Sequence, residues 1–598
     1  MRSPAPALLA LAVAAVFGCE GRPRSGSAGG AIRQEARSGP SIAVIDLSDG
    51  APEQQTSGLL GLSSRGDSFD GLVREVERLH HGKQARGVLV RLGTARIGLA
   101  RATEIGAMLE GLAESMPVTC HADDLSNGTA YLAVRGCKHI WLSPAGSVDA
   151  IGLAAQNIYF HKLLAEQLGL DVDFLQIGKY KGAEEPFTRD GPSPEARESL
   201  QSTLAGMRAA WLEGMLHARP SLAPGTPEDG PYDARDAKAL GLVDSIGYFD
   251  EARDALERES GAARSEVRYG RGVGGGGDGL SEVLRTVVGE SLESAPVALV
   301  RADGAISLEG GGGLLGQGAG IVERRLSRVL SRVEKDDDVK AVVLRIDSPG
   351  GSALASDLLW HELMRVRAKK PLVVSVGGMA ASGGYYMAST GSVVFADATS
   401  IVGSIGVVGG KVSADRALER VGVHADTVPA RAGDASAGAR ASYESLLTPW
   451  DDATRDRLRR TMTGIYDLFL ARVAEGRNIS VERVAASAEG RIFSGREGLA
   501  RGLVDEMGGL TEAIARARRL AGLGPEARFA VAGEASGILQ ALGDDDDSSA
   551  AAGVSQPLSA LAPLAPLAAD LEPFLRSVLP MAAHEHVLCA LPFALTVR

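Results

Sequence analysis

The sequence predicts an α/β protein that contains the same domain twice. Short apolar runs alternate with amphipathic segments from residue 41 onward, and the same order of segments returns after a glycine-rich linker. Alternation of this kind is typical of α/β domains. At 598 residues, with 45% apolar side chains, the chain is long enough for more than one hydrophobic core, so we expect several domains.

The elements of the two copies can be placed in order. In the first copy we expect strands at Ile42–Leu47, Gly87–Leu92 and Val118–His121, and helices at Phe69–His80 and Ala102–Met116. After the linker 270–279, the segments Val297–Arg301, Ile321–Val333 and Ala341–Ile346 repeat the first strand, the first helix and the second strand. Short motifs repeat as well. Tyr386-Met387-Ala388 follows Tyr131-Leu132-Ala133 by 255 positions, and Gly502-Leu503-Val504-Asp505 follows Gly241-Leu242-Val243-Asp244 by 261.

The charge of the chain excludes some functions. A formal net charge of -12, with no basic stripe, argues against a nucleic-acid partner. The acidic runs Asp336–Asp338 and Asp544–Asp547 lack the spaced ligands and the glycine turn of a calcium loop, so we expect solvated loops and no metal site.

The first residues predict export. Arg2 precedes an apolar run, Ala5 to Phe17, that is shorter than the roughly 20 residues needed to cross a bilayer. Gly18-Cys19 follows it and resembles the bacterial lipoprotein cleavage box. We therefore expect Cys19 to be the lipidated first residue of the mature protein, with simple secretion or an uncleaved anchor as alternatives.

The remaining cysteines are Cys120, Cys137 and Cys589. They show neither a CxxC metal spacing nor a disulfide framework, so we expect Cys120 and Cys137 to be core residues.

Ser382 is the candidate nucleophile. It follows the apolar strand Pro371–Val376 within a turn of glycines and alanines. If a helix begins there, the hydroxyl lies at the positive helix end and the amide of Gly383 points to where an oxyanion would form. The alternative is a close-packed turn with a capping serine. The offset of 255 places Asn127 at this position of the first copy, which therefore lacks the hydroxyl.

A second motif follows the strand Ala341–Ile346. The turn Asp347-Ser348-Pro349-Gly350-Gly351-Ser352 contains glycines that can expose backbone amides to an anion or a carbonyl. The first copy has Gly93-Thr94-Ala95-Arg96 instead, without the Pro-Gly-Gly. Only the second copy therefore holds both a candidate nucleophile and a candidate oxyanion loop.

The candidate base is a lysine of the first copy. His361 and His424 lie outside the strand region after Ser382 and are expected to be surface or core residues. A lysine can act as a base if burial lowers its pKa from about 10.4 toward about 7 to 8. Lys181 aligns with Asp434 of the second copy, so serine and lysine occur in opposite copies, as in one composite site. Alternatively, Lys179 and Lys181 are solvated loop charges.

These motifs together resemble those of the signal peptide peptidase A family, also called protease IV, in its long two-repeat bacterial form. The matching segments are GGMAASGGYY around Ser382, IDSPGGS at Ile346–Ser352, TSIVGSIG at Thr399–Gly406 and YKGAEEPFTRDGPSPEARE at Tyr180–Glu198. The resemblance covers roughly Ser41 to Leu523 in order. It implies a tandem duplication of a domain with a fold like Clp protease and crotonase.

The resemblance also implies a function. Members of the family use a Ser-Lys dyad, without a cofactor, to cut remnant signal peptides and other apolar peptides at the membrane of the cell envelope. It assigns the nucleophile to Ser382, the base to Lys181, the oxyanion-hole amides to Gly351 and Gly383, and a hydroxyl that holds the lysine amine to Ser404. Lys179 has no role. A homo-oligomer, a tetramer, on the periplasmic side of the membrane is expected.

The sequence departs from the family at both ends. The long form usually begins with a membrane-spanning anchor, where this chain has the lipobox-like Gly18-Cys19. The tail after about Phe529 has no recognised counterpart and is expected to be a linker with short helices. Two other functions remain open, a catalytically silent peptide-binding scaffold and a crotonase-like acyl-transfer enzyme. The expected parts are a signal peptide (1–18), a flexible linker (19–40), the lysine copy (41–268), a glycine-rich linker (269–294), the serine copy (295–525) and a mobile tail (526–598).

Overall fold

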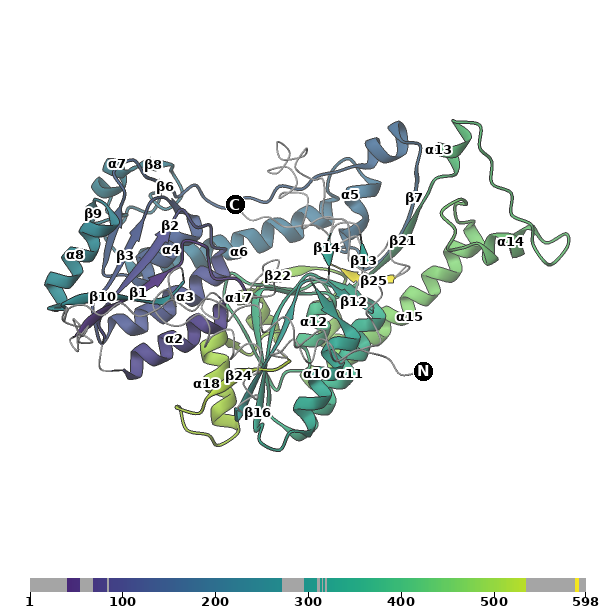
Figure 1. Cartoon of the computed structure of the whole chain (residues 1–598). Helices are drawn as coiled ribbons and strands as arrows, with labels where there is room; N and C mark the ends of the chain where they lie inside the picture. The colour runs from purple at the N-terminus through teal and green to yellow at the C-terminus, as the bar shows by residue number, and fades with distance from the viewer. Residues whose placement is uncertain are drawn as a thin grey trace, which may run out of the picture. The chain divides into compact units, whose positions relative to one another are not determined.

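Two mainly parallel β-sheets, one in each half of the chain, form the framework (Figure 1). The computed structural model describes residues 40–53, 68–82, 85–270, 295–308, 312–313, 316–317, 320–533 and 587–590. The predicted signal peptide, Cys19 and most of the glycine-rich linker lie outside the described residues. Among the helices that are described, none is long and apolar enough to span a bilayer.

The first sheet has the strand order β10-β1-β2-β3-β5-β9, with all neighbours parallel. Its strands are β1 (Ser41–Asp46), β2 (Ala85–Gly93), β3 (Val118–Ala122), β5 (His139–Leu142), β9 (Ser245–Ile246) and β10 (Arg264–Tyr269). The α-helices described in this half are α2 (Phe69–His81), α3 (Leu99–Ala113), α4 (Asn127–Gly136), α5 (Glu185–Thr188), α6 (Pro194–Ala218), α7 (Ala234–Ala239) and α8 (Phe249–Ser260).

The second sheet follows the path β22-β20-β18-β16-β11-β24, with β19 beside β18 and β23 beside β19. Its strands are β11 (Val297–Asp303), β16 (Ala341–Ser348), β18 (Leu372–Ala381), β19 (Val393–Ala396), β20 (Ile401–Gly403), β22 (Ile492–Ser494), β23 (Glu506–Met507) and β24 (Phe529–Val531). The helices are α10 (Glu323–Lys335), α11 (Ala353–Lys369), α12 (Gly383–Ala388), α13 (Asp415–Glu419), α14 (Ala435–Ala441), α15 (Asp452–Arg477), α16 (Val481–Ala485), α17 (Gly495–Arg501) and α18 (Leu510–Leu520).

Apolar patterning explains why these segments form these elements. Strands covered on both faces read as continuous apolar runs, and the first six residues of β16 are all buried. Leu326, Leu330 and Val333 of α10 recur at helical spacing and are buried in the second core, whereas the helix also carries several arginines.

The predicted duplication is visible in the connectivity. The order β1-α2-β2-α3-β3-α4-β5 matches β11-α10-β16-α11-β18-α12-β19. In each half the last helix leads to a strand that pairs in parallel with the first strand, β10 with β1 and β24 with β11. The expectation of an α/β fold with a repeated domain is therefore confirmed.

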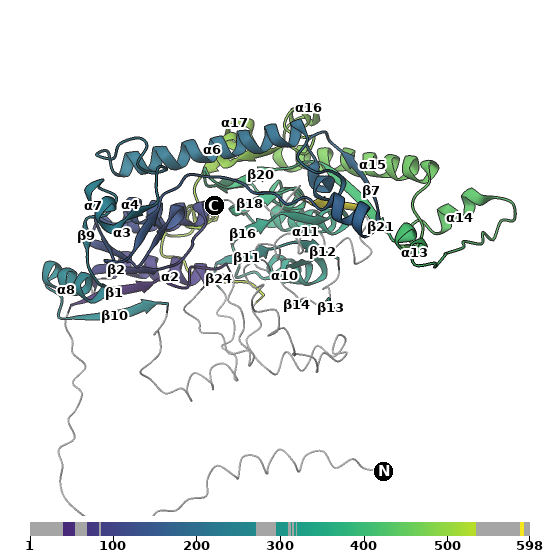
Figure 2. The ribbon, with the colours of Figure 1, turned by 90° about the horizontal axis from the view of Figure 1, so that it is seen from above.

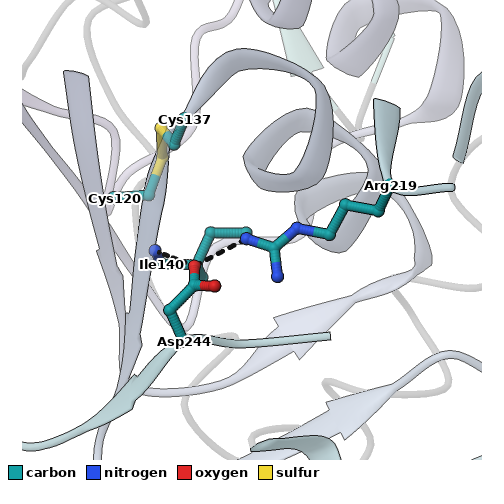
Figure 3. Close-up of a disulfide and its surroundings, with 5 residues drawn as sticks. All are labelled: Cys120, Cys137, Ile140, Arg219 and Asp244. Atoms are coloured by element: carbon teal, nitrogen blue, oxygen red, sulfur yellow. Dashed lines mark hydrogen bonds and ion pairs between the residues drawn. A yellow bond between two sulfur atoms is a disulfide. The ribbon is translucent and has the colours of Figure 1, made fainter. Parts of the chain in front are cut away.

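The repeated Gly-Leu-Val-Asp motif has the same structural role in both halves. Asp244 accepts a hydrogen bond from the Ile140 backbone N–H at 2.7 Å and pairs with Arg219 at 2.6 Å, just beyond α6 (Figure 3). Asp505 accepts one from the Val394 N–H at 2.7 Å and pairs with Arg477, the last residue of α15. Each aspartate thus ties the end of a long helix to a strand of the sheet.

The first half also contributes a strand to a sheet of the second half. A third sheet has the order β15-β12-β17-β25-β21-β7. Its strands are β7 (Asp171–Ile177), β12 (Ile306–Ser307), β15 (Ile321–Val322), β17 (Gly350–Ser352), β21 (Val407–Ser413) and β25 (Val587–Ala590). β7 pairs antiparallel with β21, so that Ile177 lies opposite Val407. Figure 2 shows α6 extending from the first half to lie beside α17. α6 also packs against β22, where Thr203 of α6 donates a hydrogen bond to the Ile492 carbonyl at 3.1 Å.

Buried charges add to this contact between the halves. Arg345 of β16 is 2% exposed and pairs with Glu104 of α3 at 2.5 Å and with Glu53 at 2.8 Å. Asp70 of α2 also pairs with Arg301 of β11. The two copies therefore share a polar interface that is withdrawn from water.

The structure corrects one expectation about the cysteines. Cys120 and Cys137 are buried in the core, as expected, but the expected absence of a disulfide is wrong. The two cysteines form a disulfide (Figure 3), because Cys120 lies in β3 and Cys137 caps α4, which brings their Cα atoms to 5.8 Å. The residues expected to form a mobile tail include two paired strands, β24 beside β11 and β25 between β17 and β21.

Candidate active site

Ser382 occupies a constrained turn between β18 and α12. Its backbone has φ 55° and ψ -115°, a conformation that residues other than glycine seldom adopt. The Ser382 N–H donates to the Gly403 carbonyl at 2.8 Å, and the Ser382 carbonyl accepts from the Tyr386 N–H at 2.8 Å. These bonds hold the turn, and the serine is fully buried.

Glycine at position 384 lets the two predicted motifs approach each other. A Cβ there would lie 2.7 Å from the carbonyl oxygen of Ser348, the last residue of β16, which leads into the Pro-Gly-Gly turn. The small residues that surround the serine in the sequence therefore permit the contact between the serine turn and the Pro-Gly-Gly turn.

Lys181 of the first half reaches this turn through β7. Its side chain is fully buried, and its Nζ lies 2.7 Å from Oγ of Ser382. Nζ also donates hydrogen bonds to the carbonyl oxygen and to Oγ of Ser404, each at 3.0 Å. The backbone of Lys181 packs against Gly490, where a Cβ would lie 2.5 Å from the backbone nitrogen of Lys181. The structure thus brings together the serine and the lysine that the sequence places in opposite copies.

Ser404 is held in a second unusual turn. Its φ is 53°, and its N–H donates to the Arg491 carbonyl at 2.7 Å. Because the side chain and the carbonyl of Ser404 both lie 3.0 Å from the amine, this residue fixes two of the three directions in which Nζ can hydrogen-bond.

The Pro-Gly-Gly turn forms the short strand β17 beside β12. A Cβ on Gly351 would lie 2.1 Å from the Ile306 carbonyl oxygen, so this position requires glycine. Ser348 Oγ donates to the Gly304 carbonyl at 2.7 Å and accepts from the Gly350 N–H at 3.2 Å. Gly383 is the first residue of α12, and the first amides of a helix have no partner within it.

Two acidic residues near the pair were not assigned a role from the sequence. Asp347 accepts hydrogen bonds from the N–H groups of Gly378 at 2.9 Å and Met379 at 3.1 Å, which joins the end of β16 to the strand that leads to the serine. Burial raises the pKa of Asp347. Glu184 lies three positions after Lys181, and burial raises the pKa of its carboxyl to about 8. A carboxyl with that pKa is mainly neutral at pH 7, and so adds little negative charge beside the lysine. In the sequence, only their positions within the IDSPGGS and YKGAEEPF segments point to a place near the site.

The other candidate bases lie elsewhere. Lys179 is exposed and pairs with Glu489 at 3.5 Å, and His361 and His424 are also exposed. Asn127, at the serine position of the first copy, donates to the Gly152 carbonyl at 2.8 Å and accepts from the Ile151 N–H at 3.0 Å. In the described part of the chain, no group of three His, Cys, Asp or Glu side chains is arranged to hold a metal ion.

Comparisons with known proteins point to one family. Residues 110–263 and 364–524, one segment in each copy, match peptidase family S49. The chain is 31% identical to Protease 4 of Haemophilus influenzae, over 68% of this chain and 65% of that protein. It is 31% identical to Protease 4 of Salmonella typhi, over 70% and 66%, and 29% identical to the chloroplastic serine protease SPPA of Arabidopsis thaliana, over 65% and 56%. The chain therefore spans less than two thirds of the length of these relatives.

Proposed function

Since this chain belongs to peptidase family S49, we propose that it is a serine endopeptidase in which Ser382 is the nucleophile and Lys181 the general base. One observation carries the proposal: a fully buried lysine amine lies 2.7 Å from the hydroxyl of a serine held in a constrained turn. A nucleophile within hydrogen-bonding distance of a base that is itself oriented by a third group is the arrangement that activates a hydroxyl.

The three oxygens around Nζ allow both protonation states that the reaction needs. In the neutral amine, two N–H bonds donate to Oγ and the carbonyl of Ser404, and the lone pair accepts the hydroxyl proton of Ser382. In the ammonium, all three N–H bonds have acceptors. Lys181 can therefore take the proton of Ser382 without a rearrangement of its neighbours.

The reaction then proceeds in two stages. Ser382 Oγ attacks a peptide carbonyl while Lys181 takes its proton, and the amides of Gly351 and Gly383 stabilise the oxyanion. The ammonium of Lys181 returns the proton to the leaving amine, which yields an acyl-enzyme. Water, activated by the neutral lysine, hydrolyses this ester and restores Ser382. No cofactor takes part.

For the substrate, we propose cleaved signal peptides and other apolar peptides at the membrane of the cell envelope. The protein acts as a homotetramer on the periplasmic side and is attached by a lipid on Cys19. The export-type first residues support this location, and the Cys120–Cys137 disulfide suits an oxidising compartment such as the periplasm.

Labelling with a fluorophosphonate, followed by mass mapping of the modified residue, tests the proposed chemistry. We expect one modified residue, Ser382, no labelling of Ser382→Ala, and slow labelling of Lys181→Met. Lys179→Met is the matched control, because this exposed lysine lies two positions away, and it should label like the wild type. An unlabelled protein that still binds apolar peptides would instead be a silent scaffold.

A further inference from the structure

A three-residue turn of the second half holds the backbone of the proposed base. This turn, residues 489–491, lies between α16 and β22. The Glu489 carbonyl accepts a hydrogen bond at 2.8 Å from the N–H of Tyr180, the residue directly before Lys181. A Cβ on Gly490 would lie 2.5 Å from the backbone nitrogen of Lys181 and 2.6 Å from its Cα. The backbone of the lysine therefore packs against the turn, with no room for a side chain between them.

The same turn holds the residue that binds the lysine amine. The Arg491 carbonyl accepts a hydrogen bond from the Ser404 N–H at 2.7 Å, and the Gly490 N–H donates to the Ile405 carbonyl at 2.7 Å. Ser404 accepts two hydrogen bonds from Nζ of Lys181, each at 3.0 Å. The turn therefore fixes Lys181 at both ends, because it contacts the lysine backbone directly and reaches the amine through Ser404.

The backbone of the 489–491 turn has an unusual conformation. Glu489 has φ 59° and Gly490 has φ 81°, so two successive residues lie in the left-handed region. Residues other than glycine seldom adopt this conformation, which persists where the surrounding contacts determine it. Gly178, which precedes Lys181 by three positions, also contacts the turn, since a Cβ there would lie 2.6 Å from the carbonyl carbon of Glu489. The turn and the segment that leads to the lysine are therefore closely fitted.

The Arg491 side chain attaches the turn to the first half. Its guanidinium carbon lies 4.3 Å from the centre of the Tyr180 ring. Nη2 donates to the Tyr180 hydroxyl at 2.9 Å and to the carboxylate of Glu198 in α6. A guanidinium is attracted to the face of an aromatic ring, and a carboxylate adds a charge-assisted hydrogen bond. The backbone and the side chain of the turn thus bind the same residue, Tyr180, directly before the lysine.

We propose that the 489–491 turn positions Lys181 against Ser382, and that Arg491 is the side chain that keeps the turn in place. This inference rests on the proposed peptidase function and adds positioning residues to it, which act through Lys181 and Ser404 and exchange no proton. Lysine and serine come from different halves, so the distance between them depends on contacts between the halves. A displacement of 1 Å in a reacting group can lower a rate about 100-fold.

Two glycine variants separate this role from backbone strain. Gly490→Ala places a Cβ against the Lys181 backbone. Gly422→Ala is the matched control, because Gly422 has φ 79°, close to the 81° of Gly490, and open space around its Cβ. With a short peptide substrate, Gly490→Ala should lower kcat by about 10- to 100-fold with KM unchanged. Gly422→Ala should keep the wild-type kcat, and melting curves should show that both variants are folded.

A third variant tests the side chain. Arg491→Met removes the contacts with Tyr180 and Glu198 and should lower kcat by up to about tenfold, and Arg491→Lys, which keeps the charge, should recover part of this loss. Arg496→Met is the matched control, since Arg496 also joins the halves, through Glu213 at 2.6 Å, and its loss should leave kcat unchanged.

The rate at which a fluorophosphonate labels Ser382 completes the test. Gly490→Ala should lower this rate about 10- to 100-fold in the wild-type chain but leave the residual rate of Lys181→Met unchanged, because the turn acts through the lysine. Arg491→Met serves for the same comparison if Gly490→Ala does not fold. An equal loss with and without the lysine, or no loss at all, overturns the inference and leaves the dyad intact. If Lys181→Met labels as fast as the wild type, the proposed base is wrong and the inference falls with it.

Discussion

Arg345→Met tests the buried polar interface between the two copies. The guanidinium donates to both carboxylate oxygens of Glu104, to Glu53 at 2.8 Å and to Ser375 Oγ at 2.8 Å. Methionine fills most of the volume but offers no positive charge. The variant therefore leaves Glu104 and Glu53 facing each other in a site with little access to water, although Glu53 keeps its contact with Arg101.

The expected loss can be estimated from the burial. Removing one partner of a buried ion pair typically destabilises a protein by about 3–5 kcal/mol, because the other charge remains without compensation. Arg345 and both glutamate side chains are at most 8% exposed, so solvent screening reduces this cost little. Arg365→Met is the matched control, since this arginine is 43% exposed where it pairs with Glu334, and the cost should stay below about 1 kcal/mol.

The assay is urea unfolding followed by circular dichroism at pH 7 and at pH 4, fitted where two probes coincide. Burial would raise the pKa of Glu53, but the charges of Arg345 and Arg101 hold it below its ordinary value. A lowered pKa stabilises the folded protein above the unfolded value of 4.5, and this contribution is lost as pH falls through the folded pKa. The difference between wild type and Arg345→Met should therefore narrow at pH 4.

A second variant checks the cause. Arg345→Met/Glu104→Gln removes a buried charge but keeps an oxygen for the Leu510 N–H, which donates to Glu104 at 2.8 Å. It should be more stable than Arg345→Met alone by roughly 1–3 kcal/mol. Two results would refute the argument. One is a loss of stability below about 1 kcal/mol for Arg345→Met. The other is a double variant whose loss equals the sum of the losses of Arg345→Met and Glu104→Gln measured separately.

Three further predictions concern the site itself. Ser382→Ala and Lys181→Met should each lower kcat by at least about 10⁴-fold. The double variant should be no slower than either single variant, because both residues act in the same step. If single-turnover assays showed that the two losses add, the serine and the lysine would not act as one pair. Gly351→Ala should lower kcat by about 10²–10³-fold, since its Cβ meets the backbone of β12, whereas Gly98→Ala, with open space around its Cβ, should have wild-type rates. The Glu184 carboxyl has its pKa raised from 4.5 to about 8, so its contribution to stability is present below pH 4.5 and is lost as pH rises through 8. The melting temperature of Glu184→Gln should therefore rise relative to that of the wild type between pH 5 and pH 9. A difference in melting temperature that stays constant over this range would contradict the burial argument.

The sequence predicts the framework well because parallel strands leave a direct signal. Both faces of β16 and β18 are covered, so each begins with an unbroken apolar run that marks its position and the turn after it. The resemblance to signal peptide peptidase A is likewise confirmed by the match to family S49 in both copies. Local patterning and motif order are enough for these two inferences.

Other features depend on contacts that no local pattern encodes. The Cys120–Cys137 disulfide arises from the packing of α4 beside β3, and the cysteine spacing gives no sign of it. The pairing of β7 with β21, in which Asp173 lies opposite Lys411, joins a strand of one half to a sheet of the other, and no repeat or periodicity in the sequence indicates it. β25 is four residues long and is paired on both sides through its backbone, so its side-chain pattern does not predict a strand.

The two copies differ in a way that the geometry explains. Asp244 and Asp505 are retained in both, because each copy must join its own long helix to its own sheet. The serine turn is different, since Lys181 enters the second half through β7 and serves only the turn at Ser382. At the corresponding turn of the first half, no lysine of the described residues is hydrogen-bonded to Asn127, whose amide binds the Ile151–Gly152 backbone with both its oxygen and its nitrogen. In the proposed mechanism a hydroxyl at position 127 would therefore have no base beside it, and the asparagine at this position holds the backbone instead.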